Sequence, residues 1–134
     1  LYPSENMEKI CVDDAVKNHL AAGVPPEKLV MGLAFYGRGK KGFPRQRDLT
    51  RAHLVEGEYT FCWDSAAQVP YIATGDGELV FGYENEVSLA LKGEYIVKNG
   101  LKGAMYWSYE GDNASGDLRE CVFKVINRKS ERED

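Results

Sequence analysis

The sequence predicts an α/β fold in which two parallel strands alternate with helices and a smaller α+β region is inserted between the strands. Two nearly continuous apolar runs, 28–35 and 101–107, lack the period-two pattern of a half-exposed strand and are typical of strands buried on both faces of a parallel sheet. A segment with helical spacing precedes each run. Residues 37–80 are rich in turn residues and charge, so we interpret them as an insertion.

The first helix is predicted over about residues 9–22. Side chains recur there at helical spacing, at Val12, Ala15, Val16, His19 and Leu20. Gly23, followed by two prolines, ends the helix because glycine caps a helix and proline cannot continue it. The apolar strand over 28–35 then follows after a short loop, which is half of an α/β repeat.

Three short strands are predicted inside the insertion. Aromatic side chains alternate with smaller or polar ones over 59–64, which is the period of a strand. Residues 69–72 and 79–81 are predicted as two further strands, separated by a turn over 74–77. These elements predict a small α+β unit.

After the insertion, the order of helix and strand resumes. Asn85 and Glu86 are predicted to begin a helix that Asn99 and Gly100 end, and the second apolar strand follows over 101–107. Ser115 is predicted to cap a last helix whose apolar residues are Leu118, Cys121, Val122, Val125 and Ile126. Two parallel strands with flanking helices cannot close a sheet by themselves, so we interpret the chain as a segment of a larger fold.

Size and charge exclude several classes of protein. The chain has 134 residues, which is room for one modest domain. Its formal charge of −4 lacks the basic field that nucleic acids require, and no apolar run has the length of a membrane span. We therefore expect neither a nucleic acid nor a membrane partner. The first residues are not a signal peptide and lack an initiator Met, which indicates a piece of a longer protein.

No cofactor or metal is expected. The three cysteines, Cys11, Cys62 and Cys121, are far apart without metal-ligand spacing and are predicted to be reduced core thiols. Two isolated histidines make no ligand set, and the glycines at 37–42 lack the Gly-Lys-Ser/Thr of a phosphate loop. The sequon at 113–115 is better explained by a helix cap than by glycosylation.

Several motifs resemble glycoside hydrolase family 18, the chitinases and chitinase-like proteins. Residues 28–38 resemble the seventh barrel strand of that family and 103–107 the eighth, while 81–92 resemble the start of its seventh helix. Trp63-Asp64 and Val69-Pro70-Tyr71 resemble its insertion. The resemblance implies an α/β fold that is the C-terminal portion of a (β/α)8 TIM barrel (helix 6, strand 7, helix 7, strand 8, helix 8) with an α+β chitinase insertion domain.

The implied domain organisation has four parts. Residues 1–36 are a barrel segment of helix and strand 7, and residues 37–82 are the insertion domain. Residues 83–127 are a second barrel segment with helix 7, strand 8 and helix 8. The polar tail over 128–134 is expected to fray.

The resemblance also implies a chemistry and a missing part. Enzymes of this family cleave β-1,4 links next to N-acetylglucosamine with retention, and the substrate's own acetamido oxygen is the nucleophile. One Glu, at the end of an Asp-x-x-Asp-x-Asp-x-Glu run, is the general acid and base. That run is absent from this sequence. We therefore expect no catalytic residue in this chain and no chitin hydrolysis by the chain alone.

The expected substrate-binding residues lie at the ends of the two apolar strands. Trp107 resembles the floor of the cleavage subsite, where an indole stacks on the sugar, and Tyr36 and Arg38 resemble the pair that lines the groove. Gly39 departs from the aromatic that often follows this arginine. Possible groove-wall residues are Trp63, Tyr71 and Tyr59, although alternate aromatics in a short strand are more often its core. Glu84 and Tyr83 are expected to hold the insertion in place.

The function implied is part of a secreted chitinase, extracellular or on the cell surface, whose partner is chitin or an N-acetylglucosamine-containing oligosaccharide. A first alternative is a family member without the catalytic acid, which would bind chitin oligosaccharides as a lectin does. A second is a structural fragment that needs the N-terminal half of the same barrel, or a second copy, to cover its strand edges.

Overall fold

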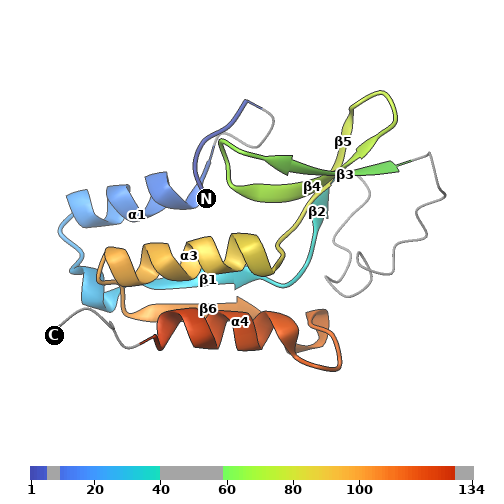
Figure 1. Cartoon of the computed structure of the whole chain (residues 1–134). Coiled ribbons are helices and arrows are strands. Elements are labelled where there is room, and N and C mark those ends of the chain that lie inside the picture. The colour runs from blue at the N-terminus through green and yellow to red at the C-terminus, as the bar shows by residue number, and fades with distance from the viewer. Residues whose placement is uncertain (6–9, 40–58, 129–134) are drawn as a thin grey trace, which may run out of the picture.

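The computed structural model describes residues 1–5, 10–39 and 59–128. These residues form a mixed α/β structure with two sheets (Figure 1). One is a two-stranded sheet of β1 and β6, and the other is a four-stranded sheet in the order β2-β5-β4-β3. The part of the predicted insertion over 40–58, and the tail from residue 129, lie outside the described residues. No helix in the described ranges has the length and apolar character needed to cross a membrane.

The first helix, α1, spans Val12–Ala21 and is shorter than predicted. Cys11 is its N-cap, and the Cys11 thiol accepts a hydrogen bond from the Asp14 amide at 3.4 Å. Ala22 follows the last turn, and Gly23 has a φ of 89°, so the glycine ends the helix as predicted. A 3-10 turn over Pro26–Lys28 leads into the first strand.

The two apolar runs pair in parallel, as predicted. Strand β1 spans Val30–Ala34 and β6 spans Gly103–Trp107, and Val30 lies opposite Gly103 at one end and Ala34 opposite Trp107 at the other. The prediction that both faces are buried is wrong for this chain. Val30, Met105 and Trp107 are 50%, 52% and 69% exposed. An apolar run indicates a strand that can be buried on both faces, but among the described residues the core covers one face of this sheet.

The helix after the insertion, α3, spans Glu86–Lys98, and its predicted ends are confirmed. Asn85 and Ser88 form a reciprocal cap, in which the side chain of each residue accepts a hydrogen bond from the other's backbone amide at 2.9 Å. Gly100 follows the helix with a φ of 63°, a conformation that favours glycine.

The last helix, α4, spans Asp117–Ile126, and the prediction that Ser115 caps it is wrong. The N-cap is Gly116, in a left-handed conformation, which makes no side-chain cap. The carboxylate of Asp112 instead accepts hydrogen bonds from the amides of Leu118 and Arg119. The helix is therefore capped from farther back in the chain, which leaves Ser115 exposed.

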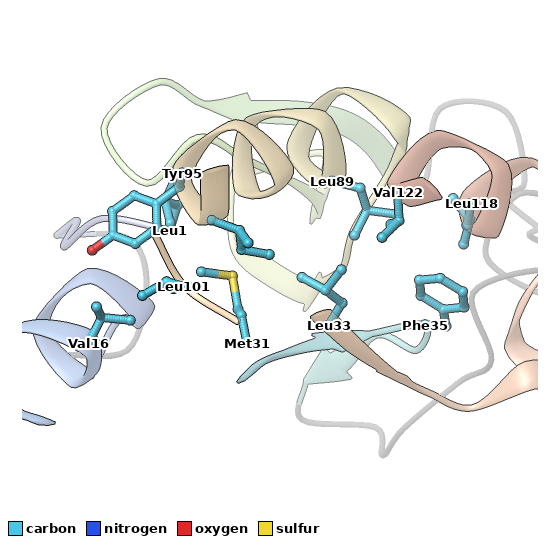
Figure 2. Close-up of a cluster of buried hydrophobic side chains, with 11 residues drawn as sticks. Leu1, Val16, Met31, Leu33, Phe35, Leu89, Tyr95, Leu101, Leu118 and Val122 are labelled. Atoms are coloured by element: carbon cyan, nitrogen blue, oxygen red, sulfur yellow. The ribbon is translucent and has the colours of Figure 1, made fainter. Parts of the chain in front are cut away.

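The core fills the space between one face of the parallel sheet and the three helices (Figure 2). Strand β1 directs Met31 and Leu33 into it, and Phe35 follows with no exposed surface. The ring of Phe35 stacks on Tyr106 with centroids 4.6 Å apart. Helices α3 and α4 approach closely at Gly93, where a Cβ atom would lie 2.7 Å from a methyl group of Val125.

The second sheet contains the three strands predicted for the insertion and one more. Strand β3 spans Tyr59–Asp64, β4 spans Val69–Thr74 and β5 spans Leu79–Gly82. The additional strand, β2, spans Arg38–Gly39 and pairs with β5. The predicted turn between β4 and β5 is confirmed by the hydrogen bond from the Thr74 amide to the Glu78 carbonyl at 2.9 Å.

The three cysteines are free, as predicted, but they are not core residues. Each thiol is only partly buried. Cys11 caps α1, and the Cys121 thiol donates to the carbonyl of Glu86 at 3.2 Å. Cys11 lies at the end of α1 and Cys121 on the side of α4, so neither side chain points fully into the core, in contrast to the prediction.

Candidate binding site

Tyr36 and Trp107 lie at the carboxyl ends of the two parallel strands. Trp107 ends β6 opposite Ala34, and Tyr36 follows two residues after Ala34. Side chains alternate along a strand, so the side chains of Ala34 and Trp107, which are paired in register, belong to the same face of the sheet. This face carries the exposed Val30 and Met105, opposite the core. The peptide bond from Trp107 to Ser108 is cis.

A cavity of about 930 Å³ lies between this end of the sheet, the start of α1 and the second sheet. Tyr36 and Arg38 contribute to its wall, together with Tyr83 and Glu84 from the return to α3. The volume is within the range of pockets that hold small ligands. The remaining lining residues are Leu1, Tyr2, Ile10, Cys11, Val12, Ala34, Gly39, Ala67, Val69, Glu78, Leu79 and Gly82.

Two of the three expected binding residues, Tyr36 and Arg38, line the cavity. Tyr36 is half-buried and Arg38 is exposed. Trp107 does not line the cavity, although it belongs to the same face of the sheet as Ala34, which does. A ligand that contacts all three residues would extend out of the cavity along the ends of the strands.

Glu84 closes the cavity on the side of α3. Its buried carboxylate accepts a hydrogen bond from the Ser88 hydroxyl at 2.7 Å and pairs with the ammonium of Lys92, itself 6% exposed. These contacts fasten the end of the second sheet to α3, which is the role expected for Glu84. The sequence interpretation missed Lys92. A single lysine on an otherwise apolar helix face could have indicated a buried ion pair.

Tyr83 forms a neutral, partly apolar part of the same wall. Its ring meets that of Phe61 edge to face, with centroids 6.4 Å apart. Its amide donates to the carbonyl of Pro70 at 3.2 Å. Burial raises the pKa of the Tyr83 phenol, so this hydroxyl is a hydrogen-bonding group at neutral pH and not a charge. The sequence interpretation placed Tyr83 at the junction, and the structure also places it on the cavity.

The possible groove-wall residues do not share one face of the second sheet. Tyr59 and Trp63 alternate with Cys62 along β3, and Tyr71 pairs with Cys62, so Tyr71 belongs to the opposite face. Tyr59 packs against the small core of this sheet, whereas Trp63 is 39% exposed. A hydrogen bond with Cys62 raises the pKa of Tyr71. None of the three aromatic residues lines the cavity.

The buried acids of the described residues are engaged in structural contacts. Asp13 pairs with Lys17 at 2.6 Å, and Asp112 with Arg119 at 3.2 Å. Asp64 accepts hydrogen bonds from the Ser4 hydroxyl at 2.5 Å and from the Ala67 amide at 2.8 Å. The described ranges hold no group of three or more side chains arranged to bind a metal. Tyr36 and Arg38 on the cavity wall have side chains that can form hydrogen bonds with a polar ligand.

Comparisons with known proteins agree with this architecture. The family model of the glycosyl hydrolases family 18 matches residues 1–112. Chitinase A1 of Niallia circulans is 32% identical over 120 residues, which cover 72% of this chain and 17% of that protein. The oviduct-specific glycoprotein of Bos taurus is 32% identical over 117 residues, which cover 70% of this chain and 21% of that protein. The chain therefore spans a small part of these relatives.

Two solved structures resemble the chain over most of its length. Chitinase ChiW from Paenibacillus sp., described as part of a cell-surface-expressed multi-modular enzyme machinery, has a TM-score of 0.84 and 32% identity, covering 96% of this chain and 13% of that one. A chitinase of Ostrinia furnacalis, solved in complex with allosamidin, has a TM-score of 0.74 and 26% identity, covering 94% of this chain and 44% of that one.

Proposed function

Since this chain belongs to the glycosyl hydrolases family 18, we propose that it is part of a chitinase that cleaves β-1,4-linked N-acetylglucosamine polymers. One observation carries the proposal: Trp107 ends β6, and Tyr36 and Arg38 follow the end of β1 in the chain, beside the carboxyl ends of parallel strands at which α/β barrels bind their substrates. The relatives named as chitinases support the substrate class.

The proposed fold is the C-terminal portion of a TIM barrel. Strands β1 and β6 would be its seventh and eighth strands, and the second sheet would belong to an insertion over residues 37–82 between barrel segments 1–36 and 83–127. The exposed face that carries Val30 and Met105 supports this proposal, because the interior of such a barrel is filled by side chains. The partner of this face is the N-terminal half of the same barrel.

The chain would bind the sugar and leave the proton transfer to another segment. The indole of Trp107 is 69% exposed and would stack on the apolar face of a sugar ring. The phenol of Tyr36 and the guanidinium of Arg38 would hydrogen-bond to sugar hydroxyl or carbonyl oxygens. The general acid of the retaining, substrate-assisted reaction would come from the N-terminal part of the barrel. The second sheet would present Tyr59 and Trp63 to the sugar from one face and Tyr71 from the other.

Replacement of Trp107 tests the proposal. We expect the chain to bind (GlcNAc)4 weakly in titration calorimetry, and Trp107→Ala to weaken binding roughly tenfold or more because the stacking surface is lost. Phe123→Ala is the matched control, since it removes a 67% exposed aromatic ring from α4. Unchanged affinity after Trp107→Ala would remove the assigned role, and turnover of a chromogenic chito-oligosaccharide by the pure chain would contradict the missing acid.

A non-catalytic, sugar-binding family member is the second candidate. It is favoured by one relative, the oviduct-specific glycoprotein, whose name is not that of an enzyme. The two candidates differ at the position of the general acid, the last residue of the Asp-x-x-Asp-x-Asp-x-Glu run, in the full-length protein. Glu at that position supports the hydrolase, and Gln or Leu supports the binding protein. For either candidate we propose an extracellular or cell-surface location, as described for ChiW.

A further inference from the structure

Within this chain Trp107 is 69% exposed, so the contacts that can hold its ring in place are those of the backbone around it. The Phe35 amide donates to the Trp107 carbonyl at 2.8 Å. Beyond Trp107 the chain makes a 3-10 turn over Tyr109–Gly111. Gly111 packs so closely on β1 that a Cβ atom there would lie 2.0 Å from the Phe35 carbonyl oxygen. The end of β6 is thus pressed against the end of β1 on both sides of Ser108.

Asp112 fastens the end of this turn to α4. Its side chain has no exposed surface. Its carboxylate accepts hydrogen bonds from the backbone amides of Asn113 at 2.8 Å, Leu118 at 3.2 Å and Arg119 at 3.1 Å. Since Gly116 supplies no side-chain cap, this buried anion satisfies the amides of Leu118 and Arg119, and the Asn113 side chain accepts from the amide of Asp117 at 3.1 Å.

Arg119 connects Asp112 back to the beginning of the turn. Its guanidinium lies 3.2 Å from the Asp112 carboxylate. The same guanidinium lies over the ring of Tyr109, 4.2 Å from the ring centroid. Tyr109 is two residues after Trp107, so one arginine contacts both ends of the turn that follows the tryptophan.

We propose that Asp112 and Arg119 are positioning residues for Trp107. Asp112 binds the end of the turn to the start of α4. Arg119 pairs with Asp112 and packs on the ring of Tyr109 at the start of the turn. Gly111, between Tyr109 and Asp112 in the chain, packs on the end of β1. Within this chain, the charged pair of Asp112 and Arg119 therefore sets the orientation of the indole. The consequence for sugar binding rests on the function proposed above, but the orientation of the ring does not.

Asp112→Asn tests the proposal in a Trp63→Phe background, in which Trp107 is the single tryptophan. The readouts are acrylamide quenching and near-ultraviolet circular dichroism of Trp107, measured well below the melting temperature, and the affinity for (GlcNAc)4. We expect both spectroscopic signals to change and the affinity to fall roughly tenfold, since small displacements of a binding group are costly. Val125→Ala, which weakens the packing of the same helix against Gly93, is the matched control and should leave the spectra and the affinity unchanged.

Arg119→Lys keeps the three backbone hydrogen bonds to Asp112 but loses the planar group over Tyr109. We expect it to shift the Trp107 signals in the same direction by a smaller amount, and it decides the question if Asp112→Asn does not fold. Spectra of Asp112→Asn and Arg119→Lys that match those of Val125→Ala would overturn the proposal. Altered spectra with no measurable sugar binding by any form would uphold the positioning role and reject the proposed function.

Discussion

The α/β part of the chain and its second sheet differ in how much apolar surface each buries. Among the described residues, eleven buried side chains form one cluster between the parallel sheet and its helices, whereas the buried cluster of the second sheet consists of Ile72 and Val80. Partly buried aromatic residues, Tyr59, Phe81 and Tyr83, extend the smaller cluster. The α/β part therefore contributes most of the hydrophobic stabilisation.

Because the two regions bury different amounts of apolar surface, the two walls of the cavity are stabilised by different kinds of contact. Tyr36 follows the well-packed strand β1, while the opposite wall of the cavity belongs to the weakly packed sheet. That sheet is fastened by polar contacts, from Glu84 to Lys92 on α3 and from Asp64 to Ser4. One wall of the site is thus held by apolar packing and the other by buried charges.

The largest expected effect is that of Phe35→Ala, which deletes a side chain with no exposed surface from the larger cluster. We expect the free energy of unfolding to fall by about 3 to 5 kcal/mol in urea denaturation. Ile72→Ala should instead accelerate amide hydrogen exchange mainly in β3, β4 and β5. If both variants lowered the free energy of unfolding equally and accelerated exchange throughout the chain, the two regions would not differ in stability.

A smaller effect is expected for Lys92→Met, which leaves the buried carboxylate of Glu84 without its ammonium partner. Removing one member of a buried ion pair should lower the free energy of unfolding by about 3 kcal/mol. Exchange should increase first in the second sheet, because the contact that fastens it to α3 is lost. Lys124→Met is the control. It breaks a pair whose side chains are 65% and 58% exposed, and it should change little.

The smallest effect is expected from Asp13, which links α1 to α3 through Tyr95 at 2.8 Å. The hydrogen bond with Lys17 holds the pKa of Asp13 below its ordinary value of 3.8. A lowered pKa means that the charged form stabilises the fold at higher pH, and that this contribution is lost as the pH falls from 3.8 through the folded-state value.

We therefore expect Asp13→Asn to be less stable than the parent at pH 7, with a difference that shrinks in thermal melts below pH 3.8. Exchange in the second sheet should not respond, because Asp13 contacts only the α/β part in the described residues. A difference in stability that is the same at all pH values would show that the charge of Asp13 is not the cause.

The local features of the fold were predictable from sequence. The start of α3 at Asn85 and Glu86 and the glycine after its end are signals within one turn of the helix, and both predictions are confirmed; the capping partner Ser88 was not predicted. The cap of α4 was not predictable, because Asp112 reaches the amides of Leu118 and Arg119 only after a left-handed Gly116 folds the chain back. Spacing along the chain does not encode that turn.

The site was predictable only in part, for a similar reason. The ends of parallel strands meet at one edge of a sheet, so the proximity of Tyr36 and Trp107 follows from two strand predictions. The separation of Tyr71 from Tyr59 and Trp63 depends on the register between β3 and β4, which side-chain periodicity alone does not specify. Tyr83 lines the cavity and Lys92 pairs with Glu84 of its wall through tertiary contacts that no local pattern reports.

The pairing of β2 with β5 has a consequence for how the chain folds. Val30 and Gly103 are partners in the parallel sheet although the whole second sheet lies between them in sequence. Closing so long a loop costs conformational entropy before any contact compensates for it. Once Arg38 lies beside Gly82, the loop is shortened to little more than α3 and its flanks. Prior formation of the second sheet therefore lowers the entropic cost of pairing β1 with β6, and it should increase the rate at which these two strands pair.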